Sequence, residues 1–194
     1  MIRLFTALCK LKFEELSDQT IFQDATDGFN HFGKKCPCCG ASGKLSLYSS
    51  YSRYLVSYKD GEIIEYQVCT RRVKCECGAT HALLPDITIP YSSYSLRFKL
   101  AVLIAYFKRD TTVVAICERF GIAVSTLYAW KVRLLEHKAL LLGVLLSQKK
   151  TALEFLRSLF DSTDLSVRLC RFYRKHAFSF LQNKLSVTTS SAPP

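Results

Sequence analysis

Two short cysteine motifs constrain the fold of this chain more than any other feature. The first is Cys-Pro-Cys-Cys-Gly at residues 36–40, and the second is Cys-Glu-Cys-Gly at residues 75–78. The glycine that follows each motif accepts a turn that points backbone amides at sulfur, and four thiolates brought together form a closed tetrahedral shell suited to structural zinc. We therefore predict a structural Zn²⁺ site whose four ligands are Cys36, Cys39, Cys75 and Cys77.

The second motif is one residue shorter than Cys-x-x-Cys, so the sequence leaves the fourth ligand open. Cys38 or Cys69 could supply a sulfur instead, and His81 could supply a nitrogen. For His81 the preferred interpretation is a hydrogen-bonded histidine just after the second motif. A redox pair is the competing interpretation of Cys-x-x-Cys, but no β-α-β pattern surrounds it.

The segment between the two motifs predicts a β-hairpin. Residues 45–58 and 62–74 are rich in β-branched and aromatic side chains, and Asp60-Gly61 between them is a strong signal for a two-residue turn. Residues 80–94 contain Pro85 and Pro90, which favours an extended linker and a domain boundary there. A segment as small as the predicted ribbon needs metal binding to supply folding energy.

Tyrosines recur along the first half of this predicted hairpin, at Tyr48, Tyr51, Tyr54 and Tyr58. Such a series could stack the bases of a single strand. Aromatic pairing across the hairpin is the simpler interpretation, and we prefer it at this point.

The most informative stretch downstream predicts a helix-turn-helix over residues 112–142. A first helix should end near Phe120, Gly121 fits a left-handed position in the turn, and a second helix should open at Ser125. The spacing of apolar residues suits two short helices that cross, and the alternative is an ordinary helical hairpin that binds nothing. These apolar residues are Ile116, Phe120, Ile122, Leu127 and Trp130.

If this unit binds DNA, its second helix enters the major groove with its first exposed side chains facing base edges. The predicted DNA-binding residues are Ser125, Thr126, Tyr128, Ala129, Lys131 and Arg133. We expect the last two to hold phosphates rather than bases. Further basic residues could extend the phosphate-binding surface: Arg97, Lys99, Lys108, Arg109 and Arg119.

The charge of the chain favours a polyanionic partner. The net charge is +11, and residues 91–150 hold ten basic and three acidic side chains, a net of +7. We expect this partner to be double-stranded DNA. The longest apolar runs fall short of the roughly 20 residues of a membrane span, so we expect no membrane and a cytoplasmic, nucleoid-associated protein.

No catalytic constellation is apparent, so we expect that the chain is not an enzyme. Beyond Lys138 the only carboxylates are Glu154, Asp161 and Asp164, and the remaining length is too short for a nuclease domain. The chain is then a DNA-binding accessory or regulatory factor. One alternative is an adaptor that recruits a recombinase or transcription component. A second is a truncated transposase lacking its catalytic domain.

These motifs predict an α+β chain in which a small zinc-ribbon β-hairpin precedes an all-α helix-turn-helix bundle, with an N-terminal helical lead-in. The predicted segments are a lead-in at 1–33, the zinc ribbon at 34–90, the helix-turn-helix domain at 91–148, C-terminal helices at 149–185 and a disordered tail at 186–194.

With these residues in hand, the chain resembles an uncharacterised bacterial family from mobile-element contexts, whose members look like a zinc ribbon followed by a transposase-type helix-turn-helix. The resemblance covers roughly residues 34–145, and its second motif is usually Cys-x-x-Cys, unlike here. It implies DNA binding linked to transposition and a transposase or recombinase as partner. A homodimer stays open, because helix-turn-helix proteins often bind paired half-sites. The matching segments are residues 36–40, 71–78, 80–86 and 116–131.

Overall fold

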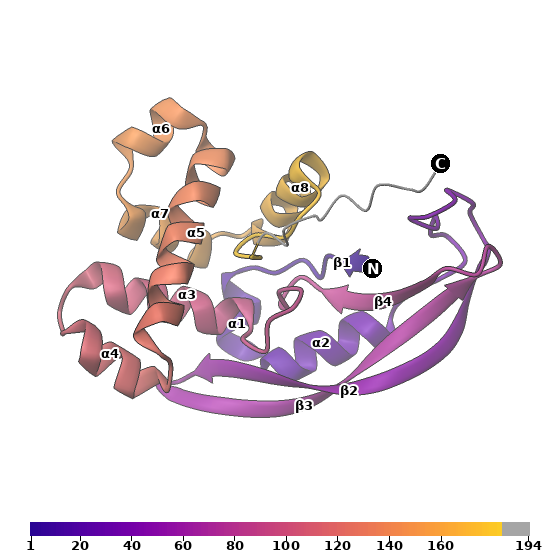
Figure 1. Ribbon diagram of the computed structural model, residues 1–194, viewed down its shortest axis with the longest axis horizontal. Helices are drawn as coiled ribbons and strands as arrows, with labels where there is room; N and C mark the ends of the chain where they lie inside the picture. Colours follow the sequence, from indigo (N-terminus) through magenta and orange to yellow (C-terminus); the bar gives the residue numbers. More distant parts are fainter. Residues whose placement is uncertain (184–194) are drawn as a thin grey trace, which may run out of the picture.

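The computed structural model describes residues 1–183 and combines eight helices with a mixed four-stranded sheet in that part of the chain (Figure 1). The predicted tail at 186–194 lies outside the described residues. The elements in chain order are β1 (Ile2–Leu4), α1 (Lys10–Glu15), α2 (Asp18–Asp27), β2 (Leu45–Lys59), β3 (Glu62–Cys75), β4 (Thr80–Pro85), α3 (Leu96–Lys108), α4 (Val113–Phe120), α5 (Val124–Leu142), α6 (Val144–Lys149), α7 (Ala152–Phe160) and α8 (Leu165–His176).

A long antiparallel hairpin of β2 and β3 is the largest element and confirms the hairpin prediction. Its pairing runs from Leu45 opposite Cys75 to Lys59 opposite Glu62, with one irregularity near Leu47. The turn is Asp60-Gly61, with φ of 52° and 91°, as a two-residue turn between twisted strands requires. The hairpin curves along one side of the molecule and places its two ends far apart (Figure 1).

The predicted order of a β-hairpin followed by an all-α bundle is wrong. Residues 80–85, expected in a linker, form β4, and the N-terminal lead-in contributes β1 as well as helices, so the sheet order is β1-β4-β3-β2. β1 pairs in parallel with β4 through Ile2 and Leu83, which lie far apart in the sequence and leave no local signal. Pro85 is the last residue of β4, where its missing N–H interrupts little of the ladder.

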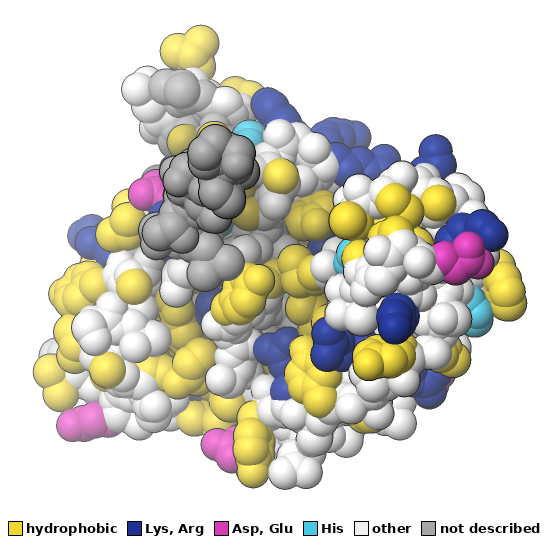
Figure 2. All heavy atoms as spheres, turned by 45° about the vertical axis from the view of Figure 1, so that its right-hand side comes forward, with side chains coloured by type: hydrophobic (Ala, Val, Ile, Leu, Met, Phe, Trp, Pro, Cys, Tyr) yellow, Lys and Arg dark blue, Asp and Glu magenta, His cyan; other side chains and the backbone are white. Residues whose placement is uncertain are grey.

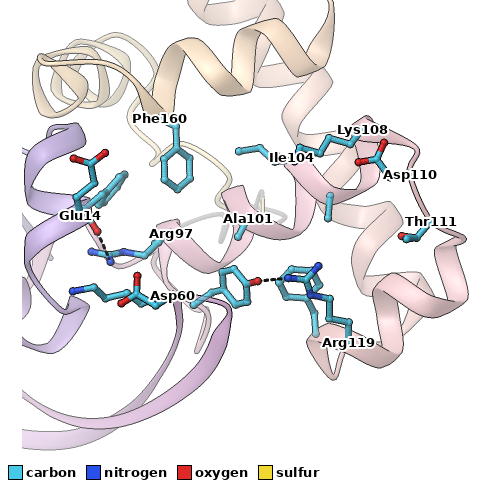
Figure 3. Close-up of a pocket in the computed structure, with 15 residues that line it drawn as sticks. Glu14, Asp60, Arg97, Ala101, Ile104, Lys108, Asp110, Thr111, Arg119 and Phe160 are labelled. Carbon is cyan, nitrogen blue, oxygen red and sulfur yellow. Dashed lines mark hydrogen bonds between the residues drawn. The ribbon is translucent and has the colours of Figure 1, made fainter.

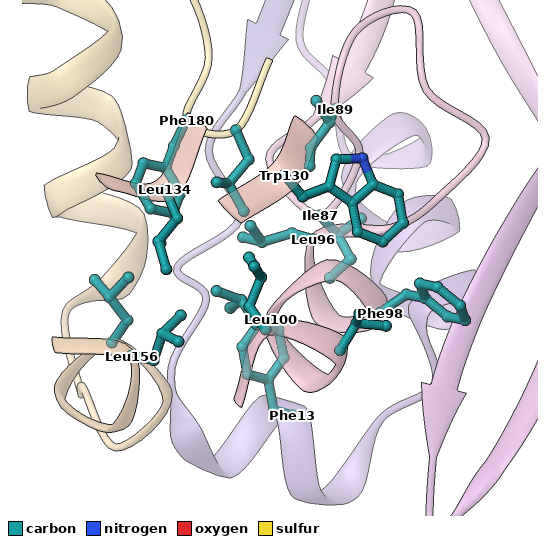
Figure 4. Close-up of a cluster of buried hydrophobic side chains, with 14 of the residues drawn as sticks. Phe13, Ile87, Ile89, Leu96, Phe98, Leu100, Trp130, Leu134, Leu156 and Phe180 are labelled. Atoms are coloured by element: carbon teal, nitrogen blue, oxygen red, sulfur yellow. The ribbon is translucent and has the colours of Figure 1, made fainter. Parts of the chain in front are cut away.

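One hydrophobic core joins segments from both ends of the chain. Figure 4 shows side chains of α1, α3, α5 and α7 converging around Leu100, which is fully buried. Helix α3 is apolar on nearly all sides because it lies at the centre of this core. A second, smaller cluster lies at the cysteine end of the sheet and consists of Ile2, Leu4, Cys36, Leu45, Val73, Cys75 and Leu83.

A buried ion pair fixes the N-terminal segment to α3. Asp18 in α2 lies with its Oδ1 2.8 Å from Nε of Arg97, and neither side chain is exposed by more than 3%. The Ser57 hydroxyl donates a hydrogen bond to the same carboxylate, and Arg97 also donates to the carbonyl oxygens of Phe13 and Leu16. Burial raises the pKa of Asp18, although Arg97 opposes that shift.

In the part of the chain that the structure describes, no single helix has both the length and the hydropathy of a membrane span. The pair α4 and α5 meets those criteria only when taken together across a bend of 101°.

Candidate metal centre and two-helix unit

The hairpin brings the two cysteine motifs to the same end of the sheet. The first motif precedes β2, and the second lies at the end of β3, where Leu45 pairs with Cys75. This is the right-hand end of the hairpin in Figure 1. The sulfur atoms of Cys36, Cys39, Cys75 and Cys77 all lie within 4.8 Å of one another.

The spacing of these sulfurs fits a tetrahedral ion. The Sγ atoms of Cys36 and Cys77 lie 3.9 Å apart, and those of Cys39 and Cys75 lie 3.7 Å apart. A zinc ion about 2.3 Å from each of four sulfurs requires sulfur–sulfur distances of about 3.8 Å. The shortened second motif does not prevent this, because its two sulfurs approach different sulfurs of the first motif. Four thiolates are a donor set that suits zinc.

Each motif is closed by a turn that ends on glycine. The Gly40 N–H donates to the carbonyl oxygen of Cys36, and the Gly78 N–H donates to that of Cys75, both at 2.9 Å. The two glycines have φ of 75° and 87°, in the left-handed region that other residues rarely adopt. The Cys38 N–H points at the Cys36 sulfur at 3.4 Å, as expected of a turn that wraps an ion.

Two thiols of this cluster, those of Cys36 and Cys75, have strongly shifted pKa values. A hydrogen bond from the backbone of Cys39 lowers the pKa of Cys36 to about 6, against the effect of burial. The backbone of Cys77 lowers the pKa of Cys75, but burial and the neighbouring thiols outweigh it and raise that pKa to about 12. The shifts are opposite because a thiol that keeps its proton can donate a hydrogen bond to a neighbouring thiolate, so Cys75 retains its proton while Cys36 is stabilised as the anion. A cation among the sulfurs would stabilise all four thiolates.

The alternative ligands lie outside the four-sulfur cluster. Cys38 and Cys69 are exposed, and Cys69 sits opposite Ser52 in the hairpin. His81 is buried, with Nε2 3.3 Å from the Cys36 sulfur and Nδ1 3.3 Å from the terminal amine of Met1. His81 therefore neighbours the cluster as a hydrogen-bond partner of Cys36, the kind of contact that orients metal ligands.

Helices α4 and α5 form a two-helix unit joined by residues 121–123. Thr112 caps α4 by accepting a hydrogen bond from the Ala115 N–H, and Gly121 ends it with φ of 60° and ψ of 36°. The second helix begins at Val124, one residue earlier than predicted. The bend of 101° lies within the roughly 90–120° typical of helix-turn-helix motifs. Buried side chains fill the crossing as the sequence predicted, at Ile116, Phe120, Ile122, Leu127 and Trp130.

The predicted DNA-contacting residues differ in their exposure. Ser125, Tyr128 and Ala129 are exposed, whereas Thr126, Lys131 and Arg133 are half-buried. The structure adds Val124 and Val132, which are exposed beside them and which we did not predict. Val132 follows Ser125 by two helical turns, so helical spacing alone could have identified it.

Most basic side chains near this unit are engaged with the protein. The Lys131 ammonium lies 5.4 Å from the ring centroid of Tyr106 and 5.5 Å from that of Tyr128. Arg133 forms an ion pair with Glu136 at 2.7 Å. Lys108 and Arg109, which end α3 just before α4, are exposed.

Two of the additional phosphate-binding residues that we predicted are buried, so that prediction is wrong for them. Arg97 is paired with Asp18, and Lys99 is 2% exposed with its ammonium 5.0 Å from the ring centroid of Trp130. Burial lowers the pKa of Lys99 to about 8. Both face inward because α3 is central to the core.

A cavity of about 420 Å³ lies where α1, the hairpin turn, α3 and α4 meet (Figure 3). Arg119 from α4 points into it and donates a hydrogen bond to the Tyr58 hydroxyl of β2, whose ring lies 5.0 Å from that of Phe120. Charges of both signs surround the cavity, including Glu14 and Lys108. This mixed rim favours no ligand of a single charge, but its contacts attach the two-helix unit to the hairpin turn.

Comparison with known proteins gives one match. The model of a family described as a domain of unknown function, DUF6431, matches residues 36–130. No curated protein and no solved structure matches the chain significantly. The matched segment begins at the first metal-site cysteine and ends at Trp130, so it includes all four cysteines, the hairpin, α4 and the start of α5. A DUF6431 domain therefore covers residues 36–130 of this chain.

Proposed function

We propose that this chain is a DNA-binding protein in which α5 enters the major groove of duplex DNA. The observation that carries this proposal is the 101° crossing of α4 and α5, with Ser125, Tyr128 and Ala129 exposed on the second helix. A major groove about 12 Å wide admits one α-helix. Small side chains at Ser125 and Ala129 would let that helix approach the base edges closely.

The charges around the unit support the same partner. Residues 91–150 have a net charge of +7, and the exposed Lys108 and Arg109 lie just ahead of α4. In helix-turn-helix proteins the first helix crosses the DNA backbone, so in the proposed complex these two cations would contact phosphates. The exposed Val132 suits contact with a thymine methyl group.

We propose a structural zinc ion for the four-cysteine cluster. A shell of four thiolates leaves no open position for substrate, so the ion would supply stability rather than chemistry. The small hydrophobic cluster at this end contains Ile2, Leu4, Leu45, Val73 and Leu83, all aliphatic side chains of modest size. Metal binding would add folding energy where this core is thin.

The role in the cell is then one of binding rather than catalysis. The resemblance to a mobile-element family supports an accessory or regulatory factor that acts beside a transposase or recombinase. A homodimer would suit paired half-sites, and the exposed Leu140, Leu145 and Leu146 on α5 and α6 offer an apolar surface for it. Sedimentation at micromolar concentration tests the dimer directly.

The test of DNA binding is selection from a random duplex library, followed by anisotropy titrations with the selected duplex over a range of salt concentrations. Affinity should fall with salt, with a logarithmic slope of about 0.9 per phosphate contacted, and Lys108→Ala should reduce that slope by about one. Metal analysis of the same sample should give one zinc per chain, and Cys39→Ser should lower it.

A pair of matched variants locates the DNA-binding surface. Ala129→Glu places a negative charge on the exposed face of α5, and it should weaken duplex binding at least tenfold. Val167→Glu introduces the same charge at an exposed position of α8 and should leave binding unchanged. No selected duplex at low salt, as the adaptor alternative expects, or equal losses from both variants would refute the proposal.

A further inference from the structure

A groove of about 470 Å³ lies beside β2, bounded by β4 and by the loop at residues 90–93. Three tyrosines that line it are exposed rather than packed: Tyr51 by 43%, Tyr54 by 60% and Tyr91 by 77%. Pairing of aromatic residues across the hairpin does not explain them, because Tyr51 sits opposite Thr70 and Tyr54 opposite Gln67. That interpretation of the tyrosine series is therefore wrong for these two positions.

The backbone of Tyr91 is unusual. Its φ of 59° lies in the left-handed region, which bulky residues rarely occupy. Its ring is the most exposed of the three, so packing does not account for a tyrosine at this position. Strained positions of this kind cluster at ligand-binding sites.

The charge of the groove favours an anion. Among the described residues, no acidic one lines it. Arg53 does line it, and its guanidinium donates a hydrogen bond to the carbonyl oxygen of Ser92 at 2.6 Å. On the adjacent strand β3, toward the cysteine end, Lys74 is exposed and Arg72 is half-buried with its guanidinium donating a hydrogen bond to the Thr80 hydroxyl. Figure 2 shows Lys and Arg side chains interspersed with hydrophobic ones on the face that includes this end, and few acidic ones.

We propose that this groove binds single-stranded nucleic acid. Bases would stack on the rings of Tyr51, Tyr54 and Tyr91, and the phosphates would lie toward the cations of β2 and β3. Exposed aromatic rings beside positive charge are the arrangement that single-strand-binding proteins use, since every base has a face that can stack. None of the residues that line the groove belongs to α5, so the chain would hold a duplex and a single strand at separate sites.

The test is anisotropy with labelled oligothymidine and oligouridine strands, each with a matched duplex as competitor. Tyr54→Ala and Tyr91→Ala should each weaken the binding of single-stranded oligonucleotides about tenfold, because a base can no longer stack on the missing ring. Tyr54→Phe and Tyr91→Phe keep the ring and should bind as the native chain does. Tyr48→Ala removes a tyrosine that is 57% exposed but does not line the groove, and it should have no effect.

The inference fails if the native chain binds neither oligothymidine nor oligouridine. It also fails if both alanine variants bind these oligonucleotides as tightly as the native chain does, or if Tyr48→Ala loses as much affinity for them as the two alanine variants do. Urea unfolding followed by the fluorescence of Trp130 checks that the variants fold, because a folded variant unfolds at the same urea concentration as the native chain. The two proposals fail separately, since Ala129→Glu should weaken duplex binding at least tenfold and leave single-strand binding unchanged. A chain that binds duplex DNA but no single-stranded oligonucleotide would overturn this inference and leave the proposal for α5 standing.

Discussion

Replacing Arg97 with methionine measures how firmly the N-terminal segment is held to the core. The side chains of Arg97 and Asp18 are 3% and 0% exposed, and their ion pair is 2.8 Å long. The substitution keeps an unbranched side chain but leaves the Asp18 carboxylate without its counter-ion. We expect Arg97→Met to lower the free energy of unfolding by about 3–5 kcal/mol, the usual cost of breaking a buried pair.

The cost should depend on pH in a defined direction. Burial already raises the pKa of Asp18, and the loss of Arg97 removes the charge that opposes this shift. A carboxyl with a higher pKa in the folded than in the unfolded chain binds more protons when folded, so it loses stability as pH rises between those two values. Arg97→Met should therefore cost less at pH 5 than at pH 8, because protonation of Asp18 relieves the unpaired charge.

The assay is urea unfolding followed by the fluorescence of Trp130, the single tryptophan of the chain. The free energy of unfolding of the variant is compared with that of the native chain at the same pH. This difference removes the pH dependence that both chains share, including that of the cysteines. Arg168→Met is the matched control, because its ion pair with Asp164 at 3.0 Å is 43% and 50% exposed and should contribute under about 1 kcal/mol. The double variant Arg97→Met with Asp18→Asn should recover part of the loss. A cost equal to that of the control, or equal at both pH values, would refute this reasoning.

Two further predictions concern α3 and the interhelical turn. Burial lowers the pKa of Lys99 to about 8, so between about pH 8 and 10.5 this side chain is protonated in the unfolded chain but not in the folded one. The free energy of unfolding should therefore rise with pH over that window by up to about 3 kcal/mol. In urea titrations across this range, Lys99→Met should lack that rise, and an identical profile would contradict the burial of Lys99. Gly121→Ala should lower the free energy of unfolding by about 1 kcal/mol, because φ is 60° there while an added Cβ meets no atom within 4 Å. Thermal unfolding measures it, and a loss above about 3 kcal/mol would indicate a clash that the structure does not contain.

Local signals account for what the sequence predicted well. Asp60-Gly61 announces its hairpin because the turn geometry demands those residue types, and Gly121 marks the end of α4 for a similar reason. The four cysteines could be grouped because a hairpin returns the chain to its starting end. Each of these inferences needs only residues that are neighbours or that one turn brings together.

The missed features depend on partners that are distant in the sequence. The three-residue β1 is too short to show a periodic pattern, and it exists because β4 offers it an edge. Arg97 and Lys99 were expected on the surface because basic residues usually are. What buries Arg97 is Asp18, which no pattern within α3 reveals. The exposed tyrosines were misjudged because their opposite residues depend on the register of the hairpin.

The length of the hairpin determines how the proposed sites influence one another. β2 runs from Leu45 at the cysteine end to Lys59 beside α4, a contour of roughly 45 Å at about 3.3 Å per residue. The α4 end is held independently of metal, by the contact of Tyr58 with Phe120 and by the main core. The groove lined by Tyr51, Tyr54 and Tyr91 lies between the two ends of the hairpin and borders β4. Leu83 of β4 packs with Cys36 in the small hydrophobic cluster. If the proposed zinc ion is bound there, its loss should loosen the groove before it disturbs α5, so a chelator should weaken single-strand binding more than duplex binding.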